Sequence, residues 1–122
     1  MAKLNPQPRS FAEADAALKL RRTNSITIGH NTRMTRWHGS IDVWLHNTAI
    51  ITYKSDGSIE INSGGYRTVT TKDRINRLLP DGCYVYQQDW QWYLVLNGDH
   101  GRPVEFRDNM RIIRTQEGWT IA

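Results

Sequence analysis

Basic side chains gather in the middle of the sequence, where they could bind the phosphates of a nucleic acid. The four cations are Arg67, Lys72, Arg74 and Arg77. Cationic side chains that contact the sugar–phosphate backbone fix the position of a protein on nucleic acid. A solvated helix face would have the same composition, and Asp73 lowers the net charge of the group. The spacing therefore predicts either a phosphate-binding surface or an ordinary exposed face of a helix.

Aromatic residues accompany cations in two further stretches. Arg33, Arg36 and Trp37 stand close together, and Trp90 and Tyr93 belong to an alternating segment in which they are expected to face outward. Rings that stack on bases, beside cations that bind phosphates, are typical of proteins that bind single strands with little sequence preference. The alternative is that these rings fill the core in place of aliphatic residues.

Histidine and aspartate residues offer weaker chemistry. His30, His38 and His46 are evenly spaced, but a zinc site needs imidazoles that converge, and the repeated His-Asn-Thr more simply indicates strand ends that hydrogen-bond to the backbone. Asp99 and His100 could serve acid–base catalysis, which leaves a hydrolase or nuclease as a third hypothesis, although a glycine-rich turn explains them better. We predict no catalytic residue, no metal site and no cofactor, because no nucleophile elbow, phosphate loop or paired-cysteine motif is present.

Two helices are expected around these residues. Ser10 and Glu13 have the spacing of a capping box, which predicts an N-terminal helix from Ser10 to about Arg22. The apolar stripe of that helix is short and rich in alanine, so the helix must pack on the sheet or on a second copy of the protein.

The central helix follows the glycine pair at residues 64–65. Thr70 stands three residues before Asp73, which predicts a helix from Thr70 to Leu79 with Thr70 as its cap. Its apolar face would consist of Ile75, Leu78 and Leu79, and Asp73 and Arg77 would pair on the opposite face. Pro80 ends the helix.

The remaining sequence predicts antiparallel strands. From Ser25 to Ile61 apolar and polar residues alternate, which indicates a four-stranded meander with a tight turn at Asp56-Gly57. Residues 83–87 and 92–96 would form another pair, and residues 104–106 and 111–114 would add short edge strands. The predicted fold is α+β, with a strongly twisted antiparallel sheet or partly closed barrel, one inserted short helix and one N-terminal helix.

One segment resembles known proteins. The run DGSIEINSGGYRTVTTKDRINRLLP at residues 56–80, with LHNT at residues 45–48 before it, is similar to a recurrent segment of small phage-encoded proteins of unassigned function. The resemblance covers roughly the middle third of the chain. It implies a phage that infects bacteria, and it brings no catalytic residue, cofactor or substrate.

Length and composition are typical of one small domain. The 122 residues predict a flexible leader at residues 1–9 and a single domain at residues 10–122. The net charge of +4 favours a polyanionic partner. The one cysteine, Cys83, cannot form an internal disulfide, which fits a reducing cytoplasm, and no apolar stretch has the length of a membrane span.

The sequence as a whole favours a cytoplasmic phage-type binding module that has no catalytic activity and binds nucleic acid through a basic and aromatic surface. The alternative is a protein-interaction factor that docks on a host or phage protein, or forms a homodimer, through the N-terminal helix and exposed tryptophans. Trp, Tyr and Arg are enriched at the centres of protein interfaces, so one composition fits both hypotheses.

Overall fold

The structure, a computed structural model, describes residues 3–98 and 102–122, which form two helices and ten strands. The helices are α1 (Phe11–Leu20) and α2 (Val69–Leu78). The strands are β1 (Ser25–Gly29), β2 (Thr32–Trp37), β3 (Ser40–Leu45), β4 (Thr48–Lys54), β5 (Ile59–Ile61), β6 (Tyr84–Gln88), β7 (Gln91–Val95), β8 (Val104–Glu105), β9 (Met110–Thr115) and β10 (Gly118–Ile121).

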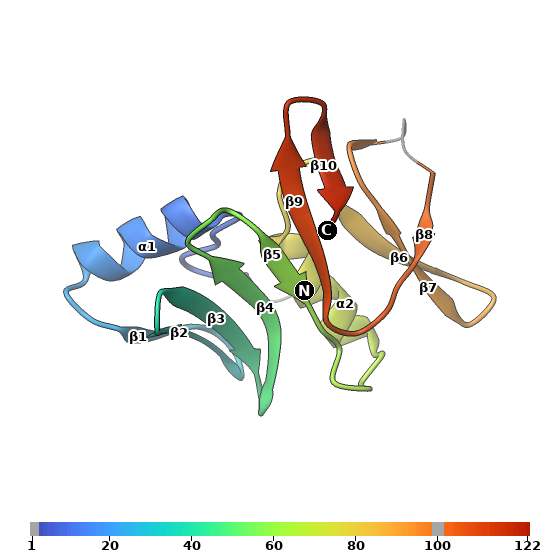
Figure 1. The fold of residues 1–122 in the computed structure, drawn as a ribbon. Coiled ribbons are helices and arrows are strands. Elements are labelled where there is room, and N and C mark those ends of the chain that lie inside the picture. Colours follow the sequence, from blue (N-terminus) through green and yellow to red (C-terminus); the bar gives the residue numbers. More distant parts are fainter. Residues whose placement is uncertain (1–2, 99–101) are drawn as a thin grey trace.

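The strands form two open antiparallel sheets (Figure 1). The larger sheet has the order β1-β2-β3-β4-β5-β9-β10, and the smaller sheet has the order β6-β7-β8. The predicted α+β class is confirmed. Because β1 and β10 end the larger sheet without pairing to each other, the sheet is not a closed barrel.

The meander predicted over residues 25–61 is present, but it has five strands where four were expected. The missed strand is β2, whose sequence TRMTRW contains one aliphatic residue, Met34, on its buried face. Its partners β1 and β3 supply the apolar contacts that its own pattern lacks, since Met34 lies opposite both Ile26 and Val43.

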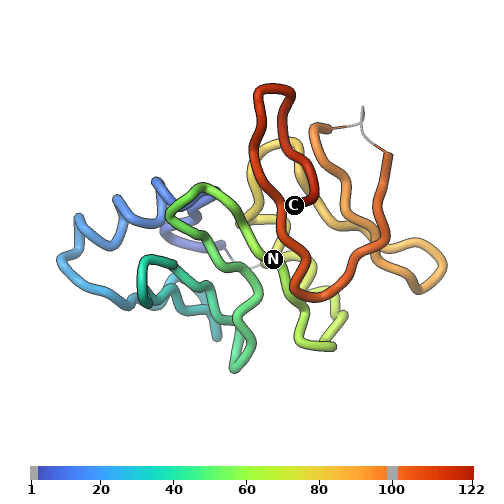
Figure 2. Tube along the Cα trace, viewed as in Figure 1, coloured from blue at the N-terminus to red at the C-terminus, as the bar shows by residue number. Residues whose placement is uncertain are grey.

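The C-terminal strands differ more from expectation. β8 is short and lies at an edge of the smaller sheet, as predicted, whereas β9 pairs with β5 on one side and with β10 on the other. The prediction that residues 111–114 form an edge strand is therefore wrong. Figure 2 shows β9 running beside β5, although the two segments are far apart in the sequence.

The main core lies between one face of the larger sheet and the two helices. Tyr53 of β4 is fully buried there, and its hydroxyl is within 2.9 Å of the carbonyl oxygen of Pro8 and 2.5 Å of that of Leu78. Ile75, Leu78 and Leu79 are buried, as predicted. With both helices on this face, no helix of the described residues lies over the opposite face of the larger sheet (Figure 1).

Residues 4–9, assigned from the sequence to a flexible leader, pack on the domain. The Leu4 side chain is 6% exposed, the Asn5 amide donates to the Ile28 carbonyl at 2.7 Å, and Arg9 donates to the Leu79 carbonyl at 2.6 Å. These contacts join the segment to the outer strand β1 and to the end of α2.

Both helices begin with a side-chain cap. Ser10 accepts a hydrogen bond from the Glu13 amide, which confirms the predicted start of α1. In α2 the cap is Thr68, whose hydroxyl accepts from the Thr71 amide at 3.1 Å. The assignment of the cap to Thr70 was wrong by two residues. Thr68, Thr70 and Thr71 are each followed by a polar residue three positions later, so the spacing alone does not distinguish them. None of the described helices is long and apolar enough to cross a membrane.

Candidate functional site

The cations of the central helix do not form a free surface. Arg74 is only 4% exposed; its Nε donates to the Thr32 hydroxyl at 3.2 Å, and its Nη1 donates to Asp73 Oδ2 at 2.9 Å. Position 74 lies one turn before the buried Leu78, so its stem shares the covered face of α2. The prediction that Arg74 points outward to bind phosphate is wrong.

Two of the other three cations also have partners within the chain. Arg77 pairs with Asp73 at 3.0 Å with the predicted i,i+4 spacing. The Arg67 guanidinium lies 5.3 Å from the centre of the Phe106 ring and 5.8 Å from that of Trp92. Lys72 is half-buried. The four residues therefore serve packing and pairing more than they offer a continuous cationic surface.

The second predicted group divides between the two faces of the sheet. Arg36 lies on the helix-covered face and pairs with Asp15 of α1 at 2.7 Å. Hydrogen bonds from Lys19 and from Arg36 hold the pKa of the Asp15 carboxyl below its ordinary value. Arg33 and Trp37 occupy alternate positions of β2 and project from the opposite, uncovered face.

Trp44 of β3 joins Arg33 on this uncovered face. The two residues are direct cross-strand partners, and Trp44 stands between the buried Val43 and Leu45. We call Arg33, Trp37 and Trp44 the outer-face patch. Arg33 donates to the Ser25 hydroxyl at 3.0 Å and has no carboxylate partner in the described part of the chain. Trp44 was not among the residues predicted for a site, although its place in the alternation of β3 was the signal that could have identified it.

A groove of about 600 Å³ runs beside Arg33 and Trp44. We call it the outer groove. Its lining is polar apart from the tryptophan ring and contains no carboxylate. The lining residues are Thr27, Asn31, Thr32, Arg33, Thr35, Trp44, His46 and Asn47.

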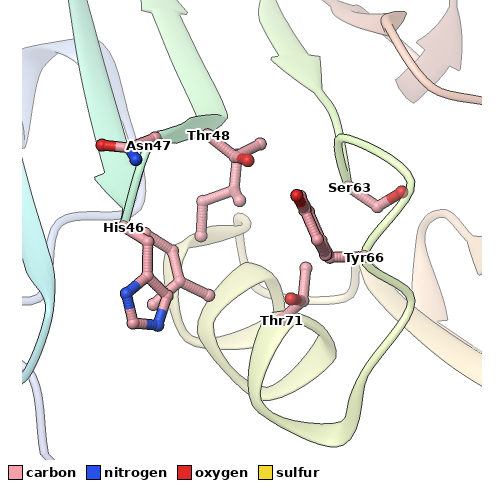
Figure 3. A pocket seen from close by; sticks show the side chains of 8 residues that line it. His46, Asn47, Thr48, Ser63, Tyr66 and Thr71 are labelled. Atoms are coloured by element: carbon pink, nitrogen blue, oxygen red, sulfur yellow. The ribbon is translucent and has the colours of Figure 1, made fainter.

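A second, smaller cavity of about 260 Å³ lies between the β3–β4 turn and the start of α2 (Figure 3). We call it the turn cavity. In Figure 3 the Tyr66 ring stands across the gap from His46 and Thr48, and Thr71 rises from α2 between them. The lining residues are Leu45, His46, Asn47, Thr48, Ile50, Ser63, Tyr66 and Thr71.

The two His-Asn-Thr segments bring these cavities together. Both His-Asn pairs form hairpin turns, and the His46 amide donates to the Asn31 carbonyl at 2.8 Å, which fixes the turns side by side. Because His46 and Asn47 line both cavities, the outer groove and the turn cavity lie on either side of this turn. His38 lies at the other end of β2, and the described residues contain no cluster of three metal-ligating side chains.

The aromatic residues of the smaller sheet have different surroundings. Trp90 is 91% exposed at the tip of the β6–β7 hairpin, whereas Tyr93 is half-buried and stacks on Tyr86 with ring centres 5.5 Å apart. Trp90 faces solvent as predicted, but Tyr93 already has a ring partner and is less free to stack on a base.

The candidate catalytic groups offer little chemistry. Asp99 and His100 lie outside the described residues. Cys83 is buried, and burial raises the pKa of its thiol, which disfavours the reactive thiolate.

Comparison with known proteins shows that most of this chain matches one protein family. The family model described as Kyanoviridae Gp96 protein matches residues 9–113. The match includes both helices, strands β1 to β8 and every residue that lines the two cavities. No curated protein and no solved structure matches this chain.

Proposed function

This chain belongs to the Kyanoviridae Gp96 protein family, a family of phage proteins, and we propose that it is a nucleic-acid-binding module without catalytic activity that acts in the cytoplasm of the bacterial host. The observation that carries the proposal is the pairing of Arg33 with Trp44 across two strands on a sheet face that no helix covers. Directly opposed side chains on one face have Cβ atoms about 5 Å apart, so the ring of Trp44 and the cation of Arg33 can contact the same nucleotide.

This arrangement favours a single strand over a duplex. A base stacks on an indole only if its own ring face is free, and bases in a duplex are already stacked on their neighbours. Arg33 can meanwhile bind the phosphate next to that base, and Trp37 extends the aromatic surface along β2. The chain's net charge of +4 further favours an anionic partner.

The outer groove can accommodate the backbone of such a strand. Its polar groups include the side chains of Thr27, Thr35 and Asn47, which can donate to phosphate oxygens, and no carboxylate in its lining would repel them. Three of the cations predicted from the sequence, Arg36, Arg74 and Arg77, each pair with a carboxylate, whereas Arg33 has no carboxylate partner among the described residues. Arg33 is therefore the cation that we expect to matter most.

The test is a fluorescence-anisotropy titration of a labelled single-stranded oligonucleotide at low salt. We expect Arg33→Gln and Trp44→Ala each to weaken binding, Trp44→Ala by about 1–3 kcal/mol. The matched control is Arg77→Gln, which removes the same charge from a residue of α2 that does not line the outer groove. Absence of binding by the wild-type protein, or equal losses in Arg33→Gln and Arg77→Gln, would contradict the proposal.

A second candidate function, docking on a host or phage protein, is supported by Trp90. A tryptophan that is 91% exposed at a hairpin tip is unusual on a surface without a partner, and tryptophan is enriched among residues that dominate interface energy. Binding through Trp90 would resist salt and would be lost in Trp90→Ser, whereas binding through Arg33 would weaken as salt rises. Sedimentation of the wild type and of Trp90→Ser tests the homodimer, because a dimer that forms through Trp90 should be lost in this variant.

A further inference from the structure

The turn cavity is large enough for a single ring, and we propose that it binds one unstacked nucleobase of a nucleic-acid strand. The inference rests on the proposed function and adds to it a site and a ligand chemistry. The volume of about 260 Å³ is slightly below the usual range of ligand pockets, roughly 300–1,000 Å³, so the cavity suits a base and not a longer ligand.

The walls have the chemistry of a stacking site. Leu45 and Ile50 are buried and contribute aliphatic side chains to the lining, and the Tyr66 ring, 66% exposed, stands across the gap from His46 and Thr48 (Figure 3). An aromatic ring together with aliphatic side chains makes the kind of surroundings in which flipped or splayed bases are held.

The polar groups at the rim are available to a ligand. Within the described residues, the side chains of His46, Asn47, Thr48 and Tyr66 make no hydrogen bond, and together they supply both donors and acceptors. A nucleobase edge presents both kinds of group in the plane of the ring. An apolar ligand would leave these hydrogen-bond donors and acceptors without partners.

The charge of the lining selects a neutral ligand group. Among the described residues no Arg, Lys, Asp or Glu lines the turn cavity, so neither a phosphate nor an ammonium group would find an opposite charge there. The outer groove, which does contain Arg33, lies on the other side of the shared His46-Asn47 turn. A strand can therefore place a base in the turn cavity and an adjoining phosphate in the outer groove.

The position of Tyr66 is fixed by a close approach of the preceding loop. Gly64 has φ +62°, and a Cβ at this position would lie 2.7 Å from Thr48 Cγ2. Only glycine allows residues 62–66 to pass this close to the β3–β4 turn, and the Tyr66 amide donates to the Ser63 carbonyl at 2.9 Å. These contacts hold the backbone at Tyr66 beside the β3–β4 turn.

The experiment measures oligonucleotide binding by the wild type, Tyr66→Ala and the control Val69→Ala, whose side chain is exposed on α2 outside the cavity lining. We expect Tyr66→Ala to weaken binding roughly tenfold, as for the loss of one stacked base, and Val69→Ala to leave it unchanged. An oligonucleotide of equal length that carries abasic sites throughout should bind the wild type and Tyr66→Ala equally. Equal affinity of wild type and Tyr66→Ala for the intact strand would overturn the inference.

Free nucleosides separate this inference from the proposed function. In an amide NMR titration we expect a nucleoside to shift the signals of Thr48, Tyr66 and Thr71, and glucose at the same concentration to leave them unmoved. If no oligonucleotide binds but the nucleoside shifts these signals, the proposed function fails and the base site stands. If neither nucleoside nor oligonucleotide shifts them, or glucose shifts them as strongly, the base site is refuted.

Discussion

Arg74 provides the clearest test of how the central helix is built, because its burial was not expected from the sequence. Its guanidinium donates to Thr32 and to Asp73, and its stem is covered. Neither partner is left without a hydrogen bond when Arg74 is removed, since Thr32 also donates to the His30 carbonyl and Asp73 also pairs with Arg77. The cost of Arg74→Ala therefore comes mainly from the stem and the two lost hydrogen bonds.

The magnitude follows from these contacts. Arg74→Ala removes two buried methylene groups, Cγ and Cδ, and at about 0.8 kcal/mol each they give roughly 1.6 kcal/mol. Hydrogen bonds from a charged donor add about 1.5–3 kcal/mol, which is partly offset because the guanidinium no longer has to be desolvated. We expect Arg74→Ala to lower the free energy of unfolding by about 2–4 kcal/mol. Arg74→Met keeps an apolar stem and should cost about 1.5 kcal/mol or less.

Urea denaturation followed by circular dichroism measures these changes. The control is Arg77→Ala, which removes a cation from the same helix, three residues on, where the side chain is partly exposed and paired with Asp73. That variant should lose no more than about 0.5 kcal/mol. If Arg74→Ala and Arg77→Ala have equal and small effects, Arg74 lies on the surface and the account of α2 is wrong.

Three further stability predictions concern the core, the cap and a buried hydroxyl. Leu78→Ala should lower the free energy of unfolding by about 2–5 kcal/mol, and an unchanged urea midpoint would show that this face of α2 is not core. Thr68→Ala should lower the free energy of unfolding by about 0.5–2 kcal/mol, whereas Thr70→Ala should change it by no more than about 0.5 kcal/mol. The opposite ranking of the two losses would show that Thr70 is the cap. Burial holds the pKa of the Tyr53 hydroxyl well above 10.0, so the unfolded chain releases this proton first, and stability should fall as pH rises above 10 by up to about 1.4 kcal/mol per unit. Tyr53→Phe should lose that part of the pH dependence in urea titrations from pH 9 to 11, and an unchanged slope would contradict it.

Much of the fold could be predicted because its signals are local. Alternation of apolar residues located β3, β4 and β5, and the Asp56-Gly57 turn closes the hairpin between the last two, with the Lys54 amide donating to the Ser58 carbonyl. β2 was missed because Thr32 and Arg36 occupy buried-face positions next to Met34, and neither residue type signals burial. Tertiary partners satisfy these polar groups, since Arg74 donates to the Thr32 hydroxyl and Arg36 pairs with Asp15 of α1.

The pairing of distant strands could not be predicted from local patterns. A short alternating stretch such as β9 looks the same whether it has one neighbour or two, and its second neighbour β5 is far away in the sequence. The same limit applies to the smaller sheet, which Asn97 joins to the larger one through hydrogen bonds of 2.7 and 2.8 Å to the backbone of Trp119.

The candidate site was predicted in part. The sequence identified Arg33 and Trp37 as a cation beside an aromatic ring, and both lie on the uncovered face. It grouped Arg36 with them, although adjacent residues in a strand point to opposite faces, and Arg36 pairs with Asp15 instead. Trp44 belongs to the site through strand pairing, which adds a contact that sequence proximity does not show.

The salt dependence of oligonucleotide binding tests the central claim most directly. Each phosphate neutralised on a single strand contributes about −0.7 to the slope of log K against log salt concentration. If Arg33 binds one phosphate, Arg33→Gln should reduce the magnitude of this slope by about 0.7, whereas Trp44→Ala should lower the affinity and leave the slope unchanged. A wild-type affinity that does not vary with salt, or an Arg33→Gln slope equal to that of the wild type, would contradict nucleic-acid binding by the outer-face patch.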